Sequence, residues 1–207
     1  MAENDKQTEE KIFEAATEVF VEKGMDGTRM QHIADRAGIN KSLLHYYYRT
    51  KDRLFEAVFE KITDQILRKF APILDENLSL EAKIRFFYRE HIEFLKKNPR
   101  LPAFFLNEIN RNPERIRKLL RNIDIENLWD TLENQHRDEL RKHSIDSGDL
   151  PQLMISIASL SVFPFVARGV FEAVLEKTGN SFDDYMEKRK EFLAEFVIRA
   201  IRNARNA

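Results

Sequence analysis

Five polar side chains fall within residues 41–47, KSLLHYY: Lys41, Ser42, His45, Tyr46 and Tyr47. An ammonium, a hydroxyl, an imidazole and two phenols can donate hydrogen bonds to phosphate oxygens and to the edges of bases. Exposing all of them on one short helix is costly as plain surface, but it suits a helix that faces a duplex. The cluster therefore predicts contact with DNA.

Two neighbouring segments could hold phosphates at the start of a helix. Lys51 opens the helix that follows the polar cluster, and Thr28 with Arg29 opens the helix that precedes it. The free N–H groups at a helix N-terminus favour anions. We therefore include Thr28, Arg29 and Lys51 among the candidate DNA-binding residues.

Three helices are predicted to position these side chains. The first begins near Thr8 and ends at Gly24, because glycine favours a helix C-terminus. The second begins at Thr28, where Gln31 three residues on completes a capping box, and it ends at Gly38. The apolar stripe of the first helix consists of Ile12, Ala16, Val19 and Phe20.

The third helix runs from Lys41 to about Tyr47, with Asn40 as its N-cap. Two short helices joined by a turn that contains glycine form a helix-turn-helix, whose second helix can enter the major groove of DNA. The same spacing occurs in purely structural bundles, so the residue types, and not the spacing, favour DNA binding.

Charge is unevenly distributed along the chain, although the total is only −1. Residues 1–27 contain three basic and eight acidic residues, a net charge of −5, whereas residues 28–53 contain six basic and two acidic residues, a net charge of +4. A local basic surface on an acidic molecule is what a polyanionic partner requires.

The remaining sequence predicts an all-α fold of about nine helices, because glycine and proline are scarce and strand-like alternation is absent. Longer helices are expected at residues 51–71, 79–97, 101–110, 113–143, 149–177 and 181–204. Residues 150–167 lack charged side chains but contain two prolines and three serines. A membrane span needs about 20 apolar residues, so we expect this segment to be buried by protein.

No catalytic motif is evident. The chain has no cysteine, no phosphate-binding glycine loop, no Gly-x-Ser-x-Gly elbow and no His-Glu-x-x-His pair. We therefore expect no enzyme, no cofactor and no metal site. A polar, acid-rich N-terminus without an apolar core favours a cytoplasmic protein.

Residues 28–55, TRMQHIADRAGINKSLLHYYYRTKDRLF, resemble the DNA-binding signature of the tetracycline-repressor (TetR/AcrR) family, and the similarity extends over about residues 8–58. The resemblance implies that Thr28, Tyr46, Tyr47 and Lys51 contact phosphates. It also implies that Lys41, Ser42, Leu43 and His45 face base edges. Ser42, Leu43 and His45 depart from the residues that are usual there, which leaves the operator sequence open.

The resemblance further implies a homodimer on a palindromic operator, with residues 1–50 as the helix-turn-helix domain and residues 51–207 as a helical domain that dimerises and binds a small effector. Repression is then more expected than activation. An apolar or amphipathic effector would shift the fourth helix and change the separation of the two recognition helices.

Two sets of residues are candidates for these further roles. Sixteen phenylalanines at helical spacing are also what a plain core would contain, so both sets rest on apolar stripes alone. The effector-pocket candidates are Phe59, Phe87, His91, Phe104, Glu108, Trp129 and Phe163. The dimer-interface candidates, on two helices that would form a four-helix contact, are Phe165, Phe192, Phe196, Val197, Ala200 and Ile201.

The alternative function is an all-helical adaptor or small-molecule-binding protein that does not bind DNA. One measurement distinguishes the two functions. A DNA-binding regulator binds DNA with an affinity that falls steeply as the salt concentration rises, whereas an adaptor does not.

Overall fold

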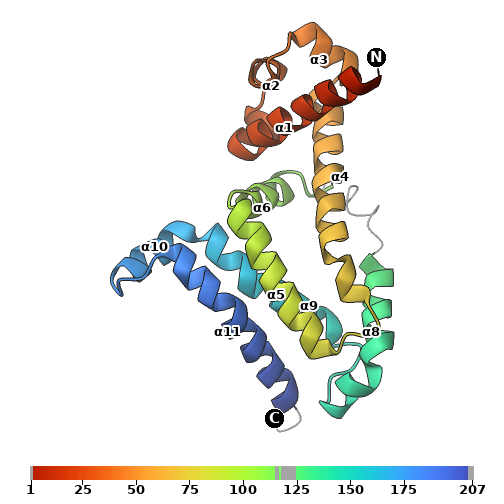
Figure 1. Ribbon diagram of the computed structural model, residues 1–207, viewed down its shortest axis with the longest axis vertical. Coiled ribbons are helices and arrows are strands. Elements are labelled where there is room, and N and C mark those ends of the chain that lie inside the picture. The colour runs from red at the N-terminus through yellow and green to blue at the C-terminus, as the bar shows by residue number, and fades with distance from the viewer. Residues whose placement is uncertain (1, 115–116, 118–124, 205–207) are drawn as a thin grey trace. The chain divides into compact units, whose positions relative to one another are not determined.

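A computed structural model describes residues 2–114, 117 and 125–204. These residues form ten α-helices and one 3-10 helix, and no strand occurs among them (Figure 1). The predicted all-helical fold is confirmed. The chain divides into two compact units, of which the first contains residues 1–67 and 103–123 and the second contains residues 68–102 and 124–207.

The first unit is built around the apolar stripe of its N-terminal helix. Its helices are α1 (Ala2–Gly27), α2 (Met30–Ala37), α3 (Lys41–Tyr47), most of α4 (Lys51–Phe70) and most of α6 (Leu101–Arg111). The rings of Phe20 and Phe55 meet edge to face, with centroids 5.1 Å apart. Fully buried positions around them are Ile12, Ala16, Val19, Ile33, Ala34, Leu44, Leu54 and Val58.

Two predictions about the start of the chain need correction. α1 begins at Ala2, and not near Thr8. The expected capping box at the start of α2 is absent, because the Thr28 hydroxyl donates to the Gly24 carbonyl and Gln31 donates to Asp35. Gly24 does break the helix as predicted, with a φ of 69°.

The second unit contains η1 (Ala71–Leu74), α5 (Leu80–Lys97), α8 (Ile125–Lys142), α9 (Leu150–Val166), α10 (Arg168–Glu176) and α11 (Phe182–Asn203). α5 and α11 lie side by side, and Tyr88, Ile92, Met186 and Leu193 form part of their buried core (Figure 1). Serines 79 and 181 cap α5 and α11, since each side chain accepts a backbone N–H of the first turn.

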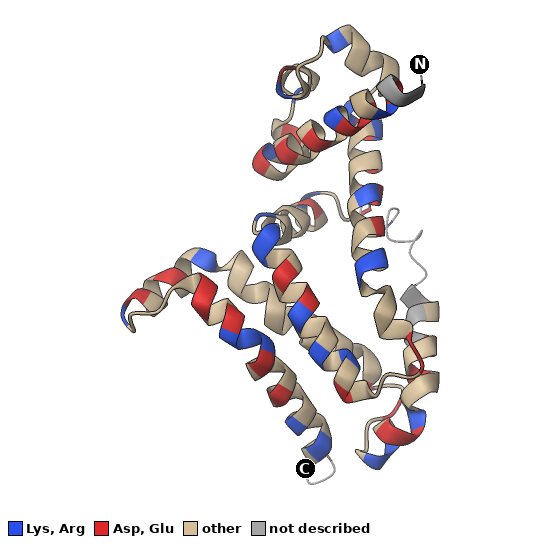
Figure 2. Ribbon diagram, viewed as in Figure 1, with Lys and Arg blue, Asp and Glu red and all other residues tan. Residues whose placement is uncertain are grey.

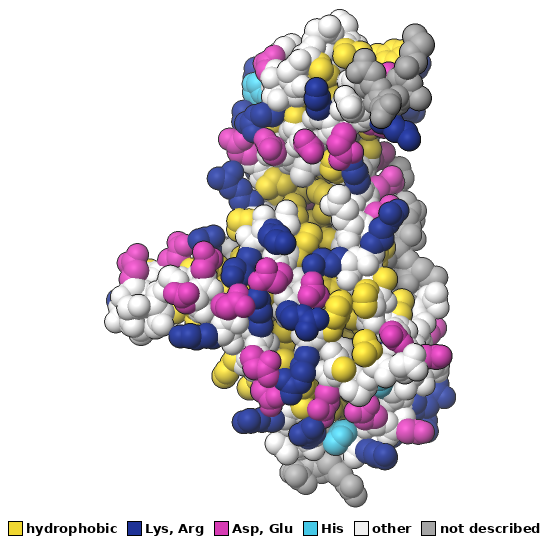
Figure 3. Space-filling view, viewed as in Figure 1, with side chains coloured by type: hydrophobic (Ala, Val, Ile, Leu, Met, Phe, Trp, Pro, Cys, Tyr) yellow, Lys and Arg dark blue, Asp and Glu magenta, His cyan; other side chains and the backbone are white. Residues whose placement is uncertain are grey.

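The solvent side of α5 and α11 carries alternating charges. Arg85 pairs with Glu191, and Lys96 pairs with Glu187 at 3.0 Å. Figure 3 shows positive and negative side chains interleaved over this face. Mixed charges at ion-pair distance are typical of a solvated surface, so this face does not attract a polyanion.

The predicted single helix over residues 149–177 is wrong. α9 ends at Val166, the backbone of Ala167 leaves the helical region, and α10 continues at an angle of 73°. Pro164 lacks an N–H group and crowds the preceding turn, which favours a bend, and the bend lies three residues further on. Within the described residues no single helix is long and apolar enough to span a membrane; α9 and α10 reach that length and hydropathy only together, as a bent pair.

Candidate nucleic-acid interface

The turn between α2 and α3 is closed by backbone hydrogen bonds. Gly38 has φ 68° and ψ 30°, a left-handed conformation that glycine adopts without strain. The next N–H, of Ile39, donates to the Ala34 carbonyl at 3.0 Å. Asn40 then caps α3, because its side-chain oxygen accepts from the Leu43 N–H at 2.8 Å. These bonds fix the direction in which α3 leaves α2.

α3 presents one face to the core and another to solvent. Leu44 is fully buried in the first unit. Lys41, Ser42 and Tyr46 are exposed, and 80% of Tyr46 is accessible. The half-buried residues of this helix that were predicted to contact DNA are Leu43, His45 and Tyr47. The structure therefore brings the whole predicted set of residues 41–47 onto one short helix.

The N-terminal turns of α1 contact the end of α3. The Tyr47 phenol donates to an Asp5 carboxylate oxygen at 3.0 Å, and the Tyr48 phenol donates to Glu9 at 3.3 Å. Removal from water and the Asp5 carboxylate both raise the pKa of Tyr47. Tyr47 therefore stays protonated and can donate a hydrogen bond. In this conformation it donates to the Asp5 carboxylate, which takes the place that a phosphate oxygen would have as acceptor.

The side chains of Thr28 and Lys51 donate hydrogen bonds to backbone carbonyls of the first unit. Thr28 is only 2% exposed, and its hydroxyl donates to the Gly24 carbonyl at 2.7 Å. The Lys51 ammonium donates to the carbonyls of Met25 at 2.7 Å and Thr28 at 3.0 Å. Carbonyls at the end of a helix have no partner within the helix, which explains why these two side chains bind them. Thr28 is therefore buried away from the surface, whereas Lys51 is half-buried and keeps one of its three N–H donors.

Glu108 of α6 binds the same segment from another side. Its side chain is 1% exposed, and one carboxylate oxygen accepts from the Met25 N–H at 3.0 Å. One oxygen of this carboxylate is thus a buried partner of the backbone, whereas Oε2 has no hydrogen-bond partner among the described residues, and a pocket role for Glu108 stays a prediction. Phe59 and Phe104 likewise belong to an aromatic core of the first unit, with Phe59 and Phe105 centroids 5.0 Å apart.

The basic residues of the region divide into occupied and exposed groups. Arg36 pairs with Glu18 at 2.6 Å and with Glu22 at 3.4 Å, so α1 neutralises it. Figure 2 shows acidic positions, in red, along much of α1. The exposed cations of residues 28–53 other than Arg36 are Arg29, Lys41, Arg49 and Arg53. Arg49 and Arg53 were missed as site residues, although the charge count of the segment included them.

The other pocket candidates do not form one site. In the second unit, the Nδ1 atom of His91 and the Ser161 hydroxyl share a hydrogen bond of 2.8 Å, and the imidazole contacts the ring of Phe87. Burial lowers the pKa of His91 to about 4, so the imidazole is neutral. Phe163 is 61% exposed. The side chain of Trp129 lies outside the part of the chain that the structure describes.

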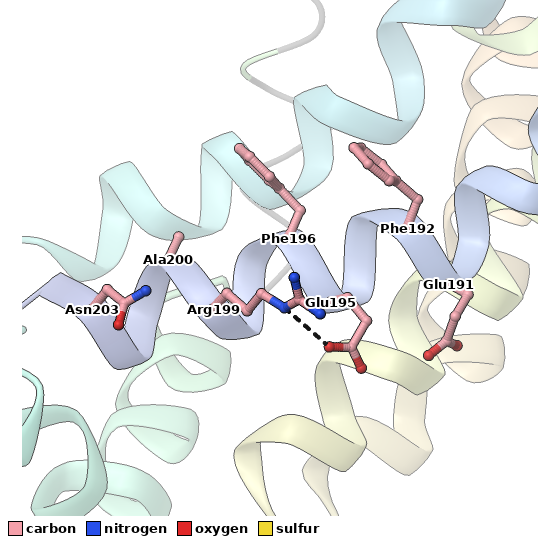
Figure 4. Close-up of a pocket in the computed structure, with 7 residues that line it drawn as sticks. All are labelled: Glu191, Phe192, Glu195, Phe196, Arg199, Ala200 and Asn203. Atoms are coloured by element: carbon pink, nitrogen blue, oxygen red, sulfur yellow. Dashed lines mark ion pairs between the residues drawn. The ribbon is translucent and has the colours of Figure 1, made fainter.

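α11 has two apolar faces, and the interface prediction mixed them. Val197 and Ile201 are buried in the core of their own unit, as is Phe165 of α9, so these three cannot meet a partner. Phe192 and Phe196 are 60% and 53% exposed and extend in the same direction from the helix (Figure 4). Ala200 continues this row along a groove bordered by the Glu195–Arg199 ion pair.

An all-helical chain with a capped two-helix turn and an exposed polar second helix is a helix-turn-helix protein. Residues 12–58 match the family described as bacterial regulatory proteins, tetR family. The likeness to this family covers that N-terminal segment.

Relatives match mainly over part of their length. The chain is 32% identical to the HTH-type transcriptional regulator RutR of Escherichia coli over 98 residues, which are 47% of this chain and 46% of RutR. It is also 32% identical to the HTH-type transcriptional activator FasR of Mycolicibacterium smegmatis over 104 residues, 48% of this chain and 46% of FasR. The chain therefore spans about half the length of the curated relatives it matches.

Solved structures share the fold over most of the chain. One is the regulator FadR from Bacillus subtilis in complex with stearoyl-CoA, with a TM-score of 0.64, 16% identity and coverage of 90% of this chain and 96% of FadR. Another is a TetR-like regulator from Rhodococcus, with a TM-score of 0.67, 18% identity and coverage of 94% and 95%. At these identities the likeness concerns the fold alone.

We expect Lys51 to stabilise the fold, whether or not it also contacts a ligand. Lys51→Met removes two charge-assisted hydrogen bonds to carbonyls, so we expect a loss of about 2 kcal/mol in the free energy of unfolding. Urea denaturation followed by circular dichroism measures this loss. Arg53→Met, on the same turn of α4 but exposed, is the matched control and should change stability by about 0.5 kcal/mol or less. Equal effects of the two substitutions would contradict the structural role of Lys51.

Proposed function

We propose that the protein is a sequence-specific DNA-binding transcriptional regulator. The observation that supports this function best is α3: a short, capped helix with Lys41, Ser42 and Tyr46 exposed and Leu44 holding it to the core. A helix in the major groove needs such donors, since bases are distinguished there by hydrogen bonds and by apolar contact with the thymine methyl group. Leu43 suits the apolar contact.

Phosphates would be bound around this helix. Arg29 precedes α2, Arg49 follows α3 and Arg53 lies in the first turn of α4, and all three are exposed. Tyr46 and Tyr47 add phenol donors. In this arrangement the arginines supply attraction that is independent of sequence, and α3 supplies discrimination between sequences.

Control by a small effector completes the proposed function. The fold resembles that of a regulator whose structure contains stearoyl-CoA, which favours an apolar or amphipathic effector. α4 offers a physical route, because Lys51 at its start binds the carbonyls of Met25 and Thr28 just before α2. An effector that shifts α4 would move this attachment, and a coupling free energy of about 1–3 kcal/mol is sufficient for regulation. Release of a repressor from a palindromic operator is the proposed outcome.

The test is an unbiased selection of bound sequences from random duplex DNA. We expect the wild type to enrich a palindrome. The double variant Lys41→Ala, Tyr46→Ala removes exposed donors of α3 and should lose the enrichment, with operator affinity reduced at least tenfold. Lys97→Ala, an exposed cation of α5, is the control and should enrich the same palindrome. If the wild type enriches no sequence and its DNA binding does not depend on salt, the adaptor becomes the better explanation.

Asp5 should oppose DNA binding. Its carboxylate accepts the Tyr47 proton and adds negative charge beside α3, so Asp5→Asn should raise DNA affinity by about two- to fivefold at low salt. Fluorescence anisotropy with the selected operator measures the change. Glu14→Gln removes the same charge from an exposed site of α1 and is the matched control. A gain of the same size in both variants would assign the effect to net charge and not to the Tyr47 hydrogen bond.

We further propose that the protein is a homodimer that associates through the exposed row Phe192, Phe196 and Ala200 of α11. Burying two large aromatic side chains supplies much of the energy of an interface. The double variant Phe192→Ser, Phe196→Ser should weaken dimerisation at least tenfold, as measured by analytical ultracentrifugation. Val170→Ser, Val174→Ser on α10 is a control of equal exposure. Dissociation by the control alone would place the interface on α10.

A further inference from the structure

The second unit encloses an apolar cavity of about 140 Å³. Residues of η1, α5, α8 and α9 line it, and all but one of the side chains are apolar. The lining consists of Ile73, Leu80, Lys83, Ile84, Phe87, Leu132, Leu140, Leu150, Leu153, Met154, Ile157 and Ala158. A ligand held here must therefore have an apolar body, and only one position offers a charge.

That position is Lys83, which is 3% exposed. Its ammonium donates to the Gln135 side-chain oxygen, and Gln135 in turn donates to the Leu74 carbonyl at 2.9 Å. An ammonium has three donors, so two remain after this bond. Among the described residues no carboxylate lies within ion-pair distance of the Lys83 nitrogen. A buried charge without a counter-ion is costly, and burial accordingly lowers the pKa of Lys83, with Asp75 opposing the shift.

A second polar group near Lys83 is also incompletely bonded. His136 is 6% exposed, and its Nε2 atom is buried without a hydrogen-bond partner in the described structure. Burial and the charge of Lys83 lower the pKa of His136, so the ring stays neutral. It therefore supplies no positive charge for an anionic ligand. The positive charge available to the cavity is that of Lys83.

The volume limits the ligand. An apolar cavity of about 150 Å³ holds a benzene molecule. A cavity of about 140 Å³ therefore fits an apolar body close to one six-membered ring.

We propose that this cavity binds a small monocarboxylate with an apolar body about the size of a benzene ring, and that the Lys83 ammonium pairs with its carboxylate. The inference rests on the proposed effector control, to which it adds a site and a chemical class. The carboxylate would supply the counter-ion that Lys83 lacks, while the ring would fill the space between α5 and α9. Charge-assisted hydrogen bonds of this kind are about twice as strong as neutral ones.

Direct binding to the full chain, without DNA, tests the site. The probes are benzoate and its neutral analogue benzyl alcohol, titrated by isothermal calorimetry. We expect benzoate to bind at least tenfold more tightly than benzyl alcohol. Lys83→Met keeps the apolar stem but removes the charge, so the preference should fall to about twofold or less. Lys142→Met, an exposed lysine of α8 outside the cavity, should keep the preference.

A second variant keeps the proposal testable if Lys83→Met does not fold. Ala158→Leu fills the cavity without altering charge and should abolish binding of both probes. Equal binding of the two probes by the wild type, or benzoate binding that Ala158→Leu leaves unchanged, would overturn the proposal. Because these titrations contain no DNA, a failed operator selection with intact benzoate binding would refute the proposed function and leave the site in place.

Discussion

The position of the helix-turn-helix depends on how one backbone segment, residues 25–28, is held. The Met25 N–H donates to the buried Glu108 carboxylate, and the Met25 carbonyl accepts from Lys51. A negative and a positive side chain thus bind opposite polar groups of one residue. Lys51 satisfies a carbonyl that the C-terminal end of a helix leaves without a partner, and Glu108 satisfies the N–H that directly follows the break at Gly24. α2 starts two residues beyond this segment, so its direction follows from these bonds.

Local signals predicted the helices well because they act over a few residues. Gly24, Gly38 and Asn40 occupy the break, the turn and the cap that their types favour. The Thr28 capping box failed for the opposite reason. Its hydroxyl could serve α2 or the carbonyls at the end of α1, and only the folded chain decides between them. The bond from Glu108 to Met25 joins residues 83 positions apart, so no pattern in the sequence indicates it.

The pocket and interface predictions grouped residues that the structure separates, for a related reason. Helical periodicity identifies apolar positions, but α11 has two apolar rows that differ by one residue. Leu193, Val197 and Ile201 face the core, whereas Phe192 and Phe196 face solvent. Neighbouring residues of a helix point about 100° apart, so the two rows lie on different faces. Both rows are apolar, and composition alone does not tell which of them is buried. Which row packs inside depends on the partner helix α5, a tertiary fact.

The distribution of charge has a consequence for how DNA would be recognised. The segment of residues 28–53 has six cations, of which Arg36 is paired with acidic residues of α1 and Lys51 is half-buried and bound to carbonyls, so four are both exposed and outside these contacts. Each phosphate that a cation neutralises adds about 0.9 to the dependence of log affinity on log salt concentration. With fewer cations available, and with acidic residues of α1 beside Tyr47, attraction that is independent of sequence is weak. Under the proposed function, base contacts of α3 would therefore supply a larger part of the operator affinity.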